Sequence, residues 1–316
     1  MSRFELSAII AVLPVVLFAI GARSFPSFEK IRFRDSVVAS VVGALGGGVV
    51  ASIGAAWLGA ALALFIFDKQ ELFRSEVFFA SPVAEEVAKS AFIAALLFLG
   101  KKRSSVAGTI VGAAAGVGFA AVENFLYFVF QTSTFDSWLE LVAIRSTLTV
   151  GMHALCGAVF GSFLAFAMRQ ETAARVFFPA LGLFVAFLIH FAWNYGVGAG
   201  SKIGTGVVFF VMVVVLFRQL WIVSLKHDRR TILEETAAFA ESGAIPETYP
   251  PRLAAIKPTR GWIDESARAE YRRVAIDAAL LKRRSRTASA KGAAKLDALV
   301  AEKLDRLAEL GKNARE

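Results

Sequence analysis

Three ionisable residues lie together in one apolar stretch of the chain. Glu85, Glu86 and Lys89 fall within residues 81–99, where most other side chains are small or apolar. On a helix that advances about 100° per residue, the lysine projects about 40° from Glu85 and about 60° from Glu86, so one ammonium group can serve both carboxylates. Because charges at bilayer depth are costly, we interpret the cluster as a site for catalysis or ion handling. The alternative is an ion pair that only pins two helices together.

Further polar side chains occur in three later apolar segments. They are Glu123, Asn124, Arg145, His153, His190 and Asn194. A single buried histidine usually serves only as a hydrogen-bonding residue, but two histidines and three glutamates in one bundle indicate a shared site. The lone Cys156 is interpreted as a small buried thiol and not as a ligand.

Membrane-spanning helices must position these residues. The chain has 316 residues, 56% of them hydrophobic, and a mean hydropathy of +0.59, which is too apolar for an ordinary soluble domain. We expect an all-α, polytopic transmembrane bundle of about seven spans over residues 1–225. The spans are expected at 6–22, 37–67, 77–100, 105–130, 139–168, 177–197 and 204–225. The second is long and rich in glycine, so it is one tilted or broken helix, or two short ones that would make eight spans.

Glycines recur at four-residue intervals in two of the expected spans. Gly108, Gly112 and Gly116 lie in one, and Gly157 and Gly161 in the other. This spacing is typical of helices whose backbones approach each other closely. We therefore expect these two spans to pack closely against neighbouring helices beside the polar residues.

Residues 226–316 are expected to form a helical tail in the cytoplasm. Helices are predicted at 231–242 and 264–284, and an apolar stripe marks a last helix that packs on the tail itself or on a partner. The stripe consists of Leu296, Val300, Leu304, Leu307 and Leu310. The net charge of +9 suits anionic lipid headgroups, and no motif indicates nucleic-acid binding.

Basic residues alternate between the connecting segments. They are frequent at 23–34, at 101–103, at 169–175 and in the tail, and sparse in the other connections. The positive-inside rule therefore predicts an outside N-terminus and a cytoplasmic tail. In that topology Glu85 lies roughly 12 Å below the outer end of its span, and Glu123 and His190 lie roughly 10 Å below theirs. Similar depths predict one shared pocket in the outer half of the membrane.

Two water-activating chemistries fit such a pocket. With neutral histidines, three carboxylates exceed Lys89 and Arg145 by one negative charge, so a proton or a cation must complete the site. Glu123, His153 and His190 could hold Zn²⁺ while a second carboxylate acts as the base. Alternatively, a glutamate deprotonates water directly, and histidine and asparagine stabilise the oxyanion.

The order of these motifs resembles the PrsW family of membrane-embedded proteases, which are relatives of the type II CAAX prenyl endopeptidases. The matching motifs, over about residues 75–200, are Glu85-Glu86-x-x-Lys89, Phe119-x-x-x-Glu123-Asn124-x-x-Tyr127, Arg145 with His153, and His190-x-x-x-Asn194. The resemblance implies that Glu85 or Glu86 is the base, with His153, His190 and Asn194 around the water. The lysine spacing and Glu123, where CAAX enzymes usually have histidine, favour PrsW over prenyl-protein processing.

The resemblance also implies a function. PrsW-type enzymes make the first cut in a single-pass membrane protein, typically an anti-sigma factor. Residues 1–225 would then be the protease domain. The resemblance implies neither a role for the tail nor a partner that binds it. The rival interpretations are a proton- or ion-coupled transporter and a non-catalytic membrane scaffold. The absence of a clear internal repeat and the single depth of the polar residues weigh against a transporter.

Overall fold

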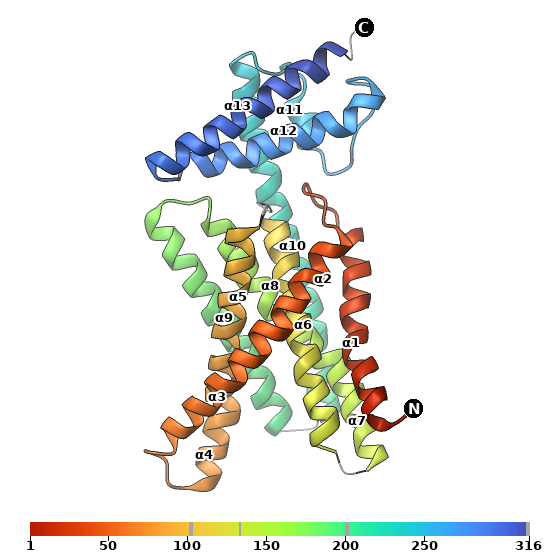
Figure 1. The fold of residues 1–316 in the computed structure, drawn as a ribbon, viewed down its shortest axis with the longest axis vertical. Helices are drawn as coiled ribbons and strands as arrows, with labels where there is room; N and C mark the ends of the chain where they lie inside the picture. Colours follow the sequence, from red (N-terminus) through yellow and green to blue (C-terminus); the bar gives the residue numbers. More distant parts are fainter. Residues whose placement is uncertain (101–103, 133, 200–201, 314–316) are drawn as a thin grey trace.

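A computed structural model describes residues 1–100, 104–132, 134–199 and 202–313, and every regular element in these ranges is helical. A tall helical bundle carries the tail at one end, and the N-terminus lies toward the opposite end (Figure 1). The helices of the bundle are α1 (Arg3–Gly21), α2 (Phe33–Val42), α3 (Val49–Leu62), α4 (Lys69–Ser75), α5 (Ser81–Leu99), α6 (Ser105–Phe130), α7 (Phe135–Ile144), α8 (Val150–Ala167), α9 (Thr172–Ala199) and α10 (Lys202–Glu241). Those of the tail are α11 (Pro250–Leu253), α12 (Glu265–Ser285) and α13 (Ala290–Asn313).

The expected all-α, polytopic bundle is confirmed. Six helices in the described ranges are long and apolar enough to cross a membrane. The 19-residue helix α5 runs among them and corresponds to the third expected span, at 77–100, but its three ionisable residues exclude it from a count based on apolarity. Residues 33–62 form one long span, so the second expected span is a single helix that crosses the bundle obliquely (Figure 1). The basic loop at 101–103 lies outside the described residues.

Three helices contain short π-helical segments. They are η2 (Gly43–Gly48) between α2 and α3, η3 (Glu76–Ala80) before α5, and η4 (Arg145–Thr149) before α8. A π turn widens the helix locally and is frequently found at functional sites. All three segments contribute residues to the same cavity, described below.

Helices α6 and α8 cross at backbone contact. A Cβ atom added at Gly112 would lie 2.0 Å from the carbonyl oxygen of Gly157, and one added at Gly116 would lie 2.0 Å from that of His153. Only glycine permits this approach. The packing predicted from the glycine spacing is thus confirmed, and it fixes the backbone of His153 against α6.

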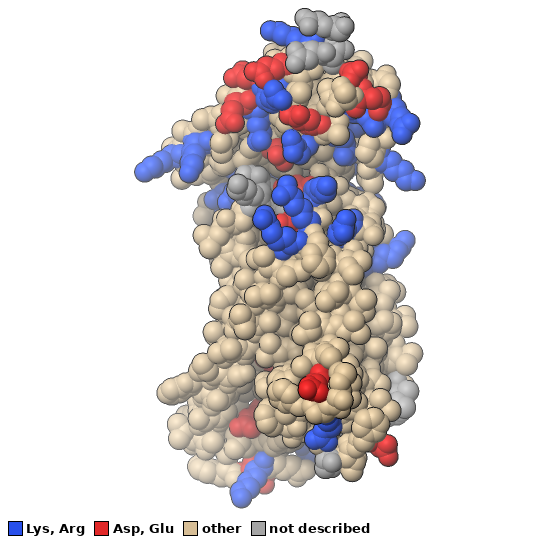
Figure 2. Space-filling view, turned by 45° about the vertical axis from the view of Figure 1, so that its right-hand side comes forward, with Lys and Arg blue, Asp and Glu red and all other residues tan. Residues whose placement is uncertain are grey.

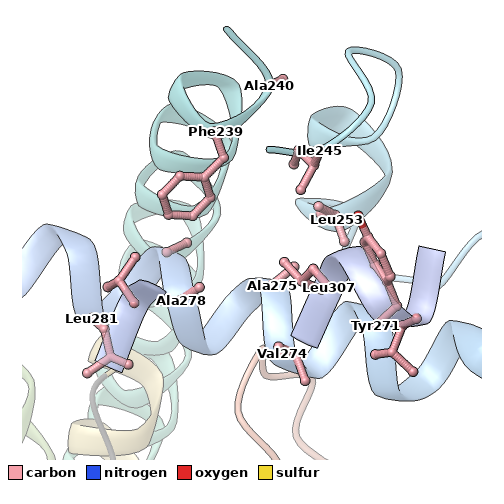
Figure 3. Packing of buried hydrophobic residues seen from close by; sticks show 13 residues of the cluster. Phe239, Ala240, Ile245, Leu253, Tyr271, Val274, Ala275, Ala278, Leu281 and Leu307 are labelled. Carbon is pink, nitrogen blue, oxygen red and sulfur yellow. The ribbon is translucent and has the colours of Figure 1, made fainter. Parts of the chain in front are cut away.

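The tail is a helical unit built on the end of α10. This helix leaves the bundle and continues to Glu241, where Phe239 packs with Leu253, Tyr271 and Leu307 (Figure 3). The apolar stripe of α13 packs against α12 and its neighbours. Of the two expected possibilities, packing on the tail itself is therefore the one observed. The proposed boundary at residue 225 falls within one continuous helix and stays a prediction.

Candidate active site

The centre of the site is a buried contact between Glu86, Lys89 and His190. Lys89 follows Glu86 by one turn of α5, and its Nζ donates to Glu86 Oε1 over 2.6 Å. The same carboxylate oxygen lies 2.8 Å from His190 Nδ1 on α9. All three residues are buried. Because a carboxylate only accepts, His190 carries its proton on Nδ1 when neutral, which leaves a lone pair on Nε2.

His153 has the opposite arrangement of protons. Lys89 Nζ lies 2.8 Å from its Nδ1, and Glu123 Oε2 lies 2.7 Å from its Nε2. An ammonium group only donates, so Nδ1 accepts and Nε2–H donates to Glu123. Both nitrogens of His153 are therefore engaged, and the two histidines differ in what they offer the site.

Arg145 holds Glu123 from the other side. Its Nη2 lies 2.8 Å from Glu123 Oε1, and its guanidinium group lies 3.7 Å from the centre of the Tyr127 ring. Asn124 fixes the arginine twice, because its Oδ1 accepts from Arg145 Nε over 2.9 Å and its Nδ2 donates to the Arg145 carbonyl oxygen over 3.2 Å. Asn124 therefore positions the arginine and does not itself line the cavity.

Glu85 differs from the other two glutamates. Its Oε2 lies 3.7 Å from His190 Nε2, and this buried oxygen has no hydrogen-bond partner among the described residues. A buried carboxylate oxygen without a partner is energetically unfavourable. Glu85 is thus the carboxylate that is ready to accept a proton or to bind a cation.

These side chains meet at a cavity of about 860 Å³. Glu85, Glu123, His153, His190 and Asn194 all line it, so the expected shared pocket is present. Each π segment contributes to the wall as well. The contributing residues are Gly48 of η2, Val77 and Phe78 of η3, and Arg145 and Thr149 of η4. Asn194 donates from Nδ2 to the carbonyl oxygen of Val77 over 2.9 Å, which ties α9 to η3.

The residues fit a metal ion, although the ligand set differs from the expected one. Ligand atoms of Glu85, His153 and His190 lie within 4.8 Å of one another. Two ligands of a tetrahedral zinc ion are about 3.3 Å apart, close to the separation of Glu85 Oε2 and His190 Nε2. Glu123, predicted as a ligand in place of Glu85, is instead engaged by Arg145 and His153. His153 would have to release one of its two contacts to bind a metal.

Several functional features were not anticipated from the sequence. The π segments gave only a weak signal, the glycine run at 46–48 in a long apolar stretch. The contact between Lys89 and His153 depends on how α5 and α8 pack, and the two residues are 64 positions apart. Glu85 and Glu86 could not be told apart in the sequence because each lies within reach of the lysine.

Comparisons with known proteins show the family to which the chain belongs. Residues 36–219 match the family model described as PrsW family intramembrane metalloprotease. Over 88 residues the chain is 33% identical to Protease PrsW of Bacillus subtilis (strain 168), a match that covers 28% of this chain and 38% of that relative. No solved structure matches. Because the family model matches more than half of the sequence, the chain belongs to the PrsW family of intramembrane proteases.

Proposed function

We propose that this protein hydrolyses a peptide bond of a single-pass membrane protein with a water molecule activated at Glu85. The observation that carries the proposal is the unpartnered Glu85 oxygen in a cavity beside His190 and His153. Membership of the PrsW family supports the reaction class. In the metal-free form of this mechanism, Glu85 takes a proton from the attacking water and later returns it to the leaving amine.

The other residues hold this arrangement in place. Glu86 orients His190, and Lys89 balances Glu86 and fixes the tautomer of His153. Glu123, held by Arg145 and indirectly by Asn124, accepts from His153. Asn194 lies in the cavity wall, where its amide can contact the substrate backbone or the developing oxyanion.

A zinc ion is the proposed cofactor. Glu85 and His190 would hold it directly, and His153 would do so after releasing Lys89 or Glu123. When bound, zinc lowers the pKa of a coordinated water and polarises the scissile carbonyl group. Glu123, once released from His153, would then be the carboxylate available as a base. The metal-free route through Glu85 stays open as the alternative.

The family resemblance suggests an anti-sigma factor, or a similar regulator, as the substrate of a first regulatory cut. The proposed orientation places the tail in the cytoplasm and the site toward the outside. It is supported by the basic residues gathered at the neck between bundle and tail (Figure 2). The lipid bilayer is the expected surrounding, and a partner for the tail stays a prediction. A transporter is less well supported, because the glutamates and histidines around Glu85 meet at a single level of the bundle, beside one cavity.

The reaction can be tested with a panel of single-pass test proteins that carry a tag on each side of the membrane. Purified wild-type protein and its Glu85→Gln variant are reconstituted with each of them in lipid vesicles. We expect wild-type protein to cut at least one test protein, which then serves as the reporter, and the variant to leave it intact. Ion flux without any cutting would favour a transporter, and neither activity would favour a scaffold.

The orientation has its own test. Single cysteines replace the exposed residues Asp136 and Glu171 in a Cys156→Ala background, and intact cells are treated with an impermeant thiol reagent. We expect labelling at 136 and protection at 171. The reverse pattern would invert the topology and move the predicted cut to the cytoplasmic side.

A further inference from the structure

The cavity is bounded on two sides by helices that do not close on each other. Among the described residues, α3 packs on α5 and η3, α4 packs on η3, and α7 packs on α6 and η4. In the described part of the chain, η2 approaches α6 closely and Ala51 of α3 shares a small cluster with Ala88 and Phe119, but α3 and α4 make no extensive packing with α6 or α7. In Figure 1 α3 and α4 diverge from α6 and α7 toward the end of the bundle farthest from the tail.

The two walls of this opening are chemically different. Beyond Gly48 of η2, which lies against Val122, α3 lines the cavity with small side chains at helical spacing, namely Ala51, Ser52 and Ala55. On the facing side it is lined by bulky apolar side chains of α6 and α7, namely Val122, Leu126, Leu141 and Ile144. We call the space between these two sets of residues the lateral groove. It leads inward to Glu85 and His190.

Polar side chains line the same cavity on elements that lie at the end of the bundle farthest from the tail (Figure 1). They are Gln70 and Arg74 of α4, Gln131 and Thr132 at the end of α6, and Ser137 and Glu140 of α7. A membrane segment that unwinds loses the hydrogen bonds of its own backbone and needs other partners. The cavity therefore combines an apolar passage with a polar end that can supply them.

We propose that the lateral groove is the entrance for the substrate. Its occupant is the outer end of a single-pass transmembrane segment, where an apolar helix gives way to a polar chain. The inference rests on the proposed function and adds the route by which the scissile bond reaches Glu85. The small side chains of α3 leave room for the backbone of the incoming segment. The lining changes from apolar to polar, as does the sequence of a membrane protein at the outer end of its transmembrane segment.

Two neighbouring alanines on α3 provide a matched test. Ala55 lines the cavity, whereas Ala56 is exposed and does not line it. Tryptophan at position 55 should fill the groove, and at position 56 it should point toward lipid, as the native Trp57 does at 75% exposure. We expect Ala55→Trp to slow cleavage of the reporter at least tenfold and Ala56→Trp to change it less than twofold. Equal rates for the two variants would overturn the inference.

A binding measurement makes the test independent of hydrolysis. A single cysteine, which is small enough to leave the groove open, is placed at position 55 or 56 in the Glu85→Gln, Cys156→Ala variant, and disulfide cross-links to tagged test proteins that carry a cysteine at the outer end of their membrane segment are measured. We expect cross-links from position 55 and few from position 56, whereas equal yields, or none from position 55, would refute the entrance. If wild-type protein cuts nothing but position 55 still cross-links a test protein, the hydrolytic function fails while the entrance stands.

Discussion

Two buried charge networks lie at opposite ends of the bundle, and they differ in whether all their carboxylate oxygens have hydrogen-bond partners among the described residues. Near the tail, both oxygens of Asp228 accept hydrogen bonds from the first turn of α6, from Ser105 N over 2.7 Å and Val106 N over 3.0 Å. Arg169 adds an ion pair at 3.1 Å. At the other end, Glu85 keeps one oxygen unpartnered beside a large cavity. The comparison teaches that burial of charge alone does not mark an active site.

The network around Asp228 has a structural role at the start of α6. The N-terminus of a helix carries a partial positive charge and unpaired N–H groups, which a carboxylate stabilises. Asp228 of α10 and Glu29, which accepts from Ser104 N over 2.7 Å, both serve the start of α6. This end of α6 is thereby fixed to α10, while its other end carries Glu123 into the site.

The largest expected effect is on catalysis. Glu85→Gln and Glu86→Gln should each reduce reporter cleavage by at least about 10³-fold, because glutamine at position 85 cannot accept the proton of water and glutamine at position 86 cannot balance Lys89. Only Glu86→Gln should also destabilise the fold, since it leaves Lys89 buried without its ion pair. Cleavage rates and thermal unfolding of both variants check this. Normal cleavage by both would refute the catalytic assignment.

The next effect is on stability at the tail end. Asp228→Asn should lower the free energy of unfolding by about 3–5 kcal/mol, because it leaves Arg169 buried without its partner. The folded fraction should still cut the reporter. Glu234→Gln is the matched control, since its ion pairs with Arg230 and Arg283 are exposed and exposed pairs contribute about 1 kcal/mol or less. If Asp228→Asn instead lost activity without losing stability, the Asp228 network would be needed for cleavage, as the Glu85 network is expected to be.

Metal content distinguishes the two ligand sets. We expect purified protein to contain up to one zinc per chain and to lose activity with a membrane-permeant chelator. Glu85→Gln and His190→Ala should lose the metal, whereas Glu123→Gln should keep it, because Glu123 is held by Arg145 and His153. Full activity in metal-free protein would instead support the direct glutamate mechanism.

The smallest expected effect comes from a solvent-exposed ion pair in the tail. Hydrogen bonds from Lys282 and Ser285 hold the pKa of Asp297 below its usual value. A lowered pKa stabilises the folded state above the unfolded value of about 3.9, and this stabilisation is lost as the pH falls. The melting temperature of wild-type protein should therefore drop slightly more than that of Asp297→Asn between pH 6 and about pH 3. An identical dependence would show that the pair is screened by solvent.

Much of this architecture could be predicted from local sequence patterns. Apolar runs located the spans, and the spacing of Gly108, Gly112 and Gly116 predicted the crossing of α6 with α8. Glu85, Glu123 and the two histidines were expected in one pocket and line the same cavity, whereas Glu86 is buried against His190 and Lys89 and does not line it. These features depend on helical periodicity and depth, which a sequence records directly.

The roles within the pocket could not be predicted in the same way. Glu85, and not the predicted Glu123, belongs to the group of possible metal ligands, because Arg145 pairs with Glu123. Arg145 begins the π turn η4, and its side chain is held by a hydrogen bond to Asn124. The three π segments shift the angular register of the helices that follow them, so ideal helical geometry misplaces the side chains beyond them. Packing between distant segments, not local pattern, decides these details.

Helix α10 connects the two ends of the molecule as a single rod. It has 40 residues, which corresponds to a length of about 60 Å, and its sequence contains neither glycine nor proline after Gly206. Its bundle half presses Phe209 and Val213 into the cluster that contains Met152, the neighbour of His153. Because neither glycine nor proline interrupts this part of the helix, a rotation of the tail about the helix axis would reach the backbone beside the imidazole of His153.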